Sequence, residues 1–93
     1  MSMNVFIVSY DLKSDDNPNY EGVSAALEKC GVVNHFQKSV CLVSSTMSAK
    51  EIRDLISPVL GERDTLFVAK IGLEWAGWRT RLAAWIESAR ANG

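Results

Sequence analysis

Carboxylates, lysines and one histidine are the side chains of this sequence that could take part in chemistry. Asp11 follows an apolar run at residues 5–10, and a carboxylate at the end of a strand is a suitable ligand for Mg²⁺ or Mn²⁺. An Asp at such a position also commonly serves a turn, so a structural role is the alternative. Asp15 and Asp16 could add ligands, or they could belong to a solvated loop. Asp11 is therefore the candidate metal-binding and catalytic residue.

His35 is the only histidine, and histidine is the residue type best suited to general acid–base chemistry near neutral pH. We expect it on a strand, at the surface or at an interface. The serines lack the glycine pattern of a nucleophile elbow, and one histidine elsewhere does not complete a triad. The sequence therefore argues against serine-hydrolase chemistry.

Lys13, Lys38 and the arginines between residues 79 and 90 could contact phosphates, although a solvated charged surface explains them equally well. Ten Lys and Arg against eleven Asp and Glu leave a net charge of -1, so nucleic-acid binding would need a local basic patch. The sequence has no glycine-rich phosphate loop and no dinucleotide fingerprint. Nucleotide-dependent enzymes are therefore not expected.

The 93 residues suffice for one modest core and are too few for two ordinary domains, which predicts a single domain over residues 1–93. Cys30 and Cys41 do not form a Cys-x-x-Cys motif, and we expect both to be buried thiols. The first eight residues lack the pattern of a secretory signal, and no apolar stretch reaches membrane-spanning length. We expect a cytoplasmic protein with no membrane contact.

Apolar spacing predicts strands at residues 5–10, 32–36, 40–43 and 66–71, with a helix over 20–30 that ends at Gly31. A second helix begins at a capping box formed by Ser48 and Glu51, and Pro58 should kink or loosen its last turn. Apolar residues at helical spacing also predict a third helix, whose apolar side should pack on the sheet or on a partner. These residues are Trp78, Leu82, Trp85, Ile86 and Ala89.

The order of these strands and helices along the chain predicts an α+β domain with a ferredoxin-like βαββαβ fold and an added C-terminal helix. Two crossover helices cover one face of the sheet, yet both faces of the first strand are apolar. Something else must therefore cover the second face. We expect Phe6, Val8 or their counterparts there to be buried in a homodimer, with the third helix lying over its own sheet or over the partner.

Short motifs spread along nearly the whole chain resemble known proteins. The strand ending at Asp11, Gly31 after the first helix, and FQKSV at residues 36–40 resemble the small CRISPR-associated adaptation proteins. Further segments resemble the SinR-like family, which is related to these proteins: YDLK at 10–13, NYE at 19–21, SAKEIRD at 48–54 and WAGW at 75–78.

The resemblance implies a ferredoxin-like homodimer in which Asp11 and its symmetry mate hold a divalent metal for phosphodiester cleavage. Residues 13–18 replace an arginine-rich stretch that is usual after this Asp, and the third helix replaces a C-terminal strand exchange. Several CRISPR-associated relatives are structural parts of a DNA-integrating complex. The resemblance therefore favours a nucleic-acid-related binding or adaptor role, with a metal-dependent RNA or DNA endonuclease and an interaction module without nucleic-acid binding as the other readings.

Overall fold

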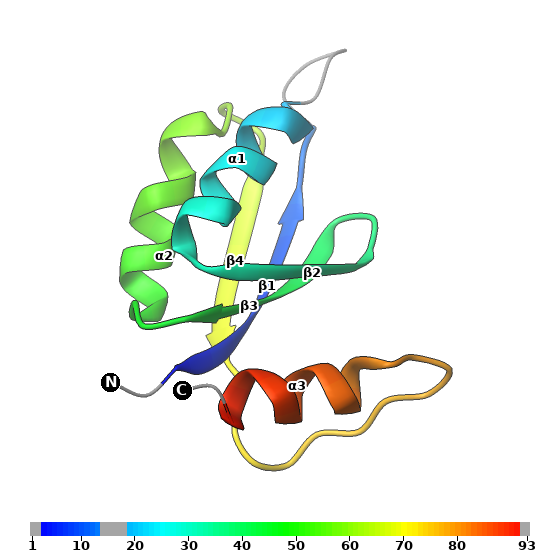
Figure 1. The fold of residues 1–93 in the computed structure, drawn as a ribbon. Coiled ribbons are helices and arrows are strands. Elements are labelled where there is room, and N and C mark those ends of the chain that lie inside the picture. The colour runs from blue at the N-terminus through cyan, green and yellow to red at the C-terminus, as the bar shows by residue number, and fades with distance from the viewer. Residues whose placement is uncertain (1–2, 14–18, 92–93) are drawn as a thin grey trace.

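The computed structural model describes residues 3–13 and 19–91, which form an α+β arrangement of four strands, three α-helices and one 3₁₀ helix (Figure 1). Its elements are, in order, β1 (Asn4–Asp11), α1 (Tyr20–Cys30), β2 (Val32–Gln37), β3 (Val40–Ser45), α2 (Ala49–Ile56), η1 (Ser57–Val59), β4 (Thr65–Lys70) and α3 (Leu82–Ala91). The prediction of an α+β domain is thus confirmed, and the arrangement is compatible with a ferredoxin-like fold.

The four strands form one antiparallel sheet in the order β2-β3-β1-β4. Val8 in the middle of β1 lies opposite Cys41 of β3 on one side and Val68 of β4 on the other. The register then places alternate residues of neighbouring strands on the same face of the sheet. One face therefore carries Val8 and its neighbours, and the other carries Ile7 and Ser9.

Helices α1 and α2 cover the face that contains Val8 (Figure 1). Leu27 of α1 and Ile52 of α2 are fully buried against it, together with Phe6. Gly31, which ends α1 as predicted, has a positive φ (φ 159°, ψ -149°). A Cβ there would lie 2.0 Å from the carbonyl oxygen of Ser44, so the close approach to β3 requires glycine.

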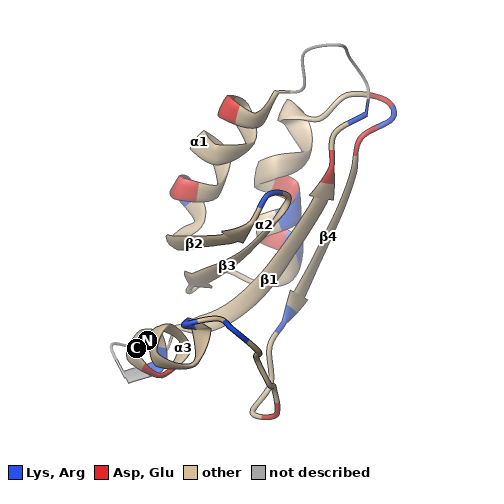
Figure 2. Ribbon diagram, turned by 90° about the vertical axis from the view of Figure 1, so that its right-hand side faces the viewer, with Lys and Arg blue, Asp and Glu red and all other residues tan. Residues whose placement is uncertain are grey.

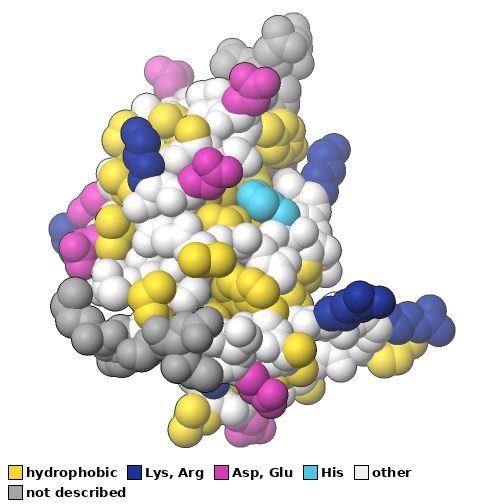
Figure 3. Space-filling model, in the orientation of Figure 1, with side chains coloured by type: hydrophobic (Ala, Val, Ile, Leu, Met, Phe, Trp, Pro, Cys, Tyr) yellow, Lys and Arg dark blue, Asp and Glu magenta, His cyan; other side chains and the backbone are white. Residues whose placement is uncertain are grey.

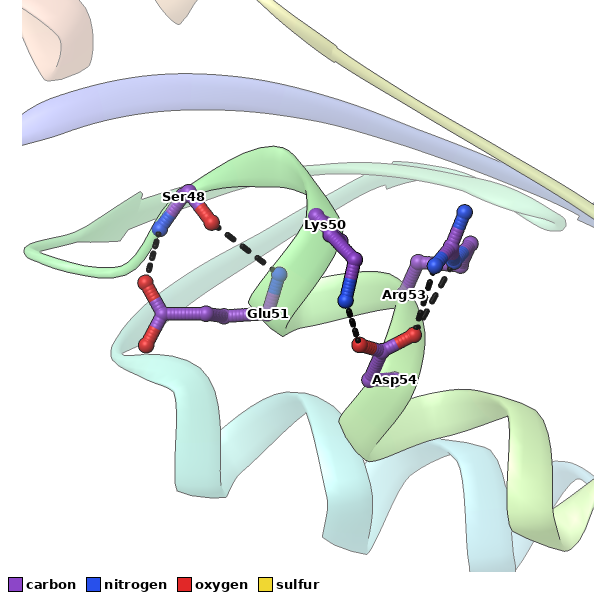
Figure 4. A network of polar contacts seen from close by, with 5 residues as sticks. All are labelled: Ser48, Lys50, Glu51, Arg53 and Asp54. Carbon is purple, nitrogen blue, oxygen red and sulfur yellow. Dashed lines mark hydrogen bonds and ion pairs between the residues drawn. The ribbon is translucent and has the colours of Figure 1, made fainter.

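Helix α2 begins with the predicted capping box, which is therefore confirmed (Figure 4). The Glu51 N–H donates to the Ser48 hydroxyl at 3.1 Å, and the Ser48 N–H donates to the Glu51 carboxylate at 3.0 Å. One turn later, hydrogen bonds from Lys50 and then from Arg53 hold the pKa of Asp54 below its usual value. The α-helix gives way to the 3₁₀ helix at Ser57–Val59, which contains Pro58, as the missing backbone donor predicts.

Helix α3 lies across one end of the second sheet face, near the start of β1 (Figure 2). Ile86 of α3 packs with Val5 and Leu42 in a second buried cluster. The Arg90 guanidinium donates hydrogen bonds to the carbonyl oxygens of Ile71 and Gly72, which ties α3 to the end of β4. The third helix therefore covers part of its own sheet.

Two details of the predicted packing are wrong. Phe6 and Val8 belong to the face under α1 and α2, so they are buried within one chain and cannot supply an uncovered surface. Trp78 lies before α3, in the segment that joins it to β4, and only the rest of the predicted stripe packs on the sheet.

Within residues 3–13 and 19–91, no helix combines the length and the apolar character needed to cross a bilayer.

Candidate functional site

The predicted site residues Asp11, Lys13 and Lys38 gather at one end of the sheet. Lys13 Nζ lies 3.2 Å from Asp11 Oδ2 in an exposed ion pair. Lys38 occupies the exposed turn between β2 and β3, and this turn adjoins β1 because the Tyr10 N–H donates to the Ser39 carbonyl at 3.0 Å. The three residues therefore share one end of the sheet.

Asp64 fixes the backbone around this end. Its Oδ1 accepts the Lys13 N–H at 2.7 Å, and its Oδ2 accepts the Gly61 N–H at 2.8 Å. Lys13, two residues after the end of β1, is thereby joined to the loop before β4. A carboxylate that accepts two backbone N–H groups stabilises the loop, and sequence reasoning did not identify it.

Asp11 alone does not fit the needs of a divalent cation. Mg²⁺ and Mn²⁺ require several oxygen ligands, and this carboxylate is paired with Lys13. Among the residues that the structure describes, no group of three His, Cys, Asp or Glu is close enough to hold a metal ion. Asp15 and Asp16 lie outside the described residues. Within residues 3–13 and 19–91, Asp11 therefore has no three-residue ligand cluster for a metal.

The other candidate nucleophiles and bases are kept apart from Asp11. His35 lies opposite Cys41 on the sheet face of α1 and α2, whereas Asp11 alternates onto the second face with Ile7 and Ser9. Burial, with Cys30 nearby, raises the pKa of the Cys41 thiol from 9.0 to about 12, so this thiol stays protonated near neutral pH. The expectation that both cysteines are buried is confirmed.

The second face of the sheet is only partly covered. Beyond α3, the face of β1 and β4 has no helix in front of it (Figure 2). Phe67 of β4 lies opposite Ser9 there and is 67 % exposed, and Ile7 and Val40 on the same face are half-buried. Asp11 ends this same row of β1, opposite Thr65. An apolar surface therefore leads directly to the end of the sheet that carries Asp11 and Lys13.

A hollow of about 560 Å³ lies between the second sheet face and the segment at residues 71–80. Phe36 and Leu42 of the sheet, Trp75 of the segment and Ile86 of α3 line it. Trp78 stands at its edge and is 77 % exposed. A cavity of this size with apolar and aromatic walls is large enough for a small organic group.

Sequence reasoning missed the hollow because it assigned Trp78 to the third helix. Gly77, directly before Trp78, was the local signal that the helical pattern breaks there.

Comparisons with protein-family models, with curated proteins and with solved structures found no match to this chain.

Proposed function

We propose that this chain is a ferredoxin-like domain that forms a homodimer and binds nucleic acid in a structural or adaptor role. The proposal includes the relationship to the SinR-like family and the small CRISPR-associated adaptation proteins that its motifs suggest. The observation that carries it is the half-covered apolar face of the sheet, where Phe67 of the edge strand β4 is 67 % exposed.

An exposed aromatic side chain on an open sheet face favours association. Phe67, Ile7 and Val40 lie on adjacent strands of this face, and α3 covers only the other end. Surfaces of this kind commonly mark protein–protein interfaces, and symmetric dimers are the commonest soluble assemblies. A two-fold axis through this face would pair Phe67 with its own symmetry mate and remove both side chains from water.

Basic side chains at both ends of this face support the proposed nucleic-acid interface. Lys13 and Lys38 lie at one end of it, and Arg79 and Arg81 belong to the segment before α3 at the other end. Figure 2 shows basic residues at both of these ends. Phosphate oxygens accept hydrogen bonds from such side chains. Because the whole chain carries a net charge of -1, these local groups must provide the attraction.

Binding accounts for the geometry better than cleavage does. Asp11 forms an ion pair with Lys13 and belongs to no group of three His, Cys, Asp or Glu that could hold a metal ion among the described residues. A dimer through the second face would bring two such carboxylates closer together, where a divalent cation could bind between them without the further ligands of a cleavage site. Lys13 then serves as the phosphate contact, and Asp11 holds the lysine side chain at the end of β1.

The test combines light scattering with binding titrations on the full chain. We expect a dimer that binds fluorescently labelled single-stranded RNA, single-stranded DNA or duplex DNA, with affinity that falls as salt rises. None of the three should be cut in Mg²⁺ or Mn²⁺. A dimer that binds none of them would support the second candidate, an interaction module without nucleic acid, which the net charge of -1 favours. Cleavage that Asp11→Asn abolishes would contradict the adaptor role.

A further inference from the structure

Trp78 is exposed in a way that packing does not explain. The other two tryptophans, Trp75 and Trp85, pack in the second cluster with Ile86, whereas Trp78 is 77 % exposed at the edge of the hollow. A large apolar ring left in water gains little free energy of burial on folding. Its place beside a hollow of about 560 Å³ suggests a ligand rather than a core contact.

The surroundings of Trp78 are positively charged. The Arg79 guanidinium lies over the indole, 4.2 Å from the ring centroid, and Arg81 follows two residues later, also exposed. Figure 3 shows Lys and Arg side chains gathered on the segment before α3, next to hydrophobic side chains. Lys70 lines the hollow from the end of β4, with Glu74 as the acidic residue of its lining. Aromatic rings beside cations suit a ligand that is flat and carries a negative charge.

The backbone at Arg79 supports the same reading. Its φ of 57° is a left-handed conformation that side chains other than glycine and asparagine seldom adopt. That conformation places a long cation directly beside the ring that precedes it. Local backbone strain of this kind is concentrated at functional positions.

We propose that this hollow receives an unpaired base of a single-stranded nucleic acid, which stacks on Trp78 while Arg79 and Arg81 contact its flanking phosphates. The inference rests on the proposed nucleic-acid function and names its substrate as single-stranded. A base in a duplex is paired and stacked and cannot turn into the hollow without being unstacked. An unpaired base has a free aromatic face and an attached phosphate, which matches the aromatic wall and the cations at its edge.

The experiment measures fluorescence anisotropy of a labelled oligothymidylate with the full wild-type chain and with Trp78→Ala. Leu73→Ala is the matched control, because Leu73 is a 92 % exposed apolar residue of the same segment that does not line the hollow. Stacking energies of single bases predict that Trp78→Ala weakens binding by about fivefold to one-hundredfold. Leu73→Ala should bind like the wild type, and thermal melts should show that both variants fold.

An oligonucleotide of equal length with abasic sites separates stacking from charge. We expect the wild type to bind it more weakly than the intact strand, and Trp78→Ala to bind the two equally. Arg79→Gln should lower the slope of log affinity against log salt by about 0.7, the value for one phosphate contact on a single strand.

Equal binding by Trp78→Ala and wild type, or no preference for intact over abasic strands, would overturn the base site and leave nucleic-acid binding in place. Binding of duplex DNA alone would overturn it in the same way. A wild-type chain that binds no nucleic acid would overturn both this inference and the nucleic-acid part of the proposed function.

Discussion

Asp11 and Lys13 form an exposed ion pair whose role is separable from the fold. The pair stands in water at the end of β1, 3.2 Å between Nζ and Oδ2, and exposed pairs contribute about 1 kcal/mol or less to stability. Asp11→Asn should therefore leave the thermal midpoint and the dimer nearly unchanged. Because a dimer through the second face brings two Asp11 carboxylates closer together, we expect Mn²⁺ to raise the melting temperature of the wild type and not of the variant.

Glu62→Gln is the control for this melt, because Glu62 is an exposed carboxylate in the loop before β4. It should show the same Mn²⁺ shift as the wild type. Equal shifts in wild type and Asp11→Asn would show that Mn²⁺ binds elsewhere, and Asp11 would then have only its contact with Lys13.

Cys41 should make stability depend on pH in the alkaline range. Its pKa rises from 9.0 to about 12 on folding because the thiol is buried, so the unfolded chain loses this proton first as pH rises. The contribution of this thiol to the free energy of unfolding is therefore fully present below about pH 9 and is lost as the pH is raised toward the folded value. Urea unfolding at a series of pH values between 8 and about 10 measures this slope.

Cys41→Ala should lower stability near neutral pH, since it removes buried volume, and it should also flatten the alkaline slope. Part of the slope should remain in the variant, because burial also raises the pKa of Cys30. A slope identical to that of the wild type would show that Cys41 does not titrate as described.

At the scale of the element, Ser48 controls the start of α2. Its hydroxyl accepts the Glu51 N–H and its own N–H is satisfied by the Glu51 carboxylate (Figure 4). Ser48→Ala removes the accepting oxygen and should cost about 1 kcal/mol of unfolding free energy. Denaturant unfolding measures the change. Nucleic-acid binding should be unaffected, because the cap lies at the α1 and α2 side of the sheet.

Ser24→Ala within α1 is the matched control for the cap. Alanine is a better helix former than serine in a helix interior, and Ser24 is not a cap, so this variant should be as stable as the wild type or slightly more so. A loss in Ser48→Ala no larger than that in Ser24→Ala would count against the capping box.

The strands and the first two helices could be predicted because their local signals agree with their packing. Apolar runs mark the strands, Gly31 marks the end of the first helix and the Ser48 cap marks the start of the second. The observed boundaries lie within about two residues of the predicted ones. The start of α3 could not be predicted in this way. A helical spacing links Trp78 to Leu82, but Gly77 and the positive φ of Arg79 break the helix before Leu82.

The face assignment failed for a related reason. Both faces of β1 are apolar, so the sequence cannot tell which one the crossover helices cover. Phe6 and Val8 were expected at an interface, and the structure buries them under α1 and α2. Packing decides which alternate set of side chains faces the crossover helices, and two equally apolar sets do not reveal this choice.

For the whole molecule, the grouping of Asp11, Lys13 and Lys38 follows from topology. In the predicted order of elements, the end of β1 and the turn between β2 and β3 lie at one end of the sheet, and the structure places them there. The hollow beside Trp78 depends on how the segment after β4 folds back over the sheet, held by Arg90. Such tertiary packing has no signature in the spacing of residues.

The central claim is that the uncovered face of the sheet joins two copies of the chain. Sedimentation equilibrium of the wild type, Phe67→Lys and Leu73→Lys at tens of micromolar tests it most directly, a concentration range suited to interfaces of ordinary size. Leu73 is the control, because it is 92 % exposed and lies beyond the end of β4. We predict dimers for the wild type and Leu73→Lys and a folded monomer for Phe67→Lys, whose lysine would be buried without a partner. A monomeric wild type, or a Phe67→Lys variant that remains a dimer, would contradict the account.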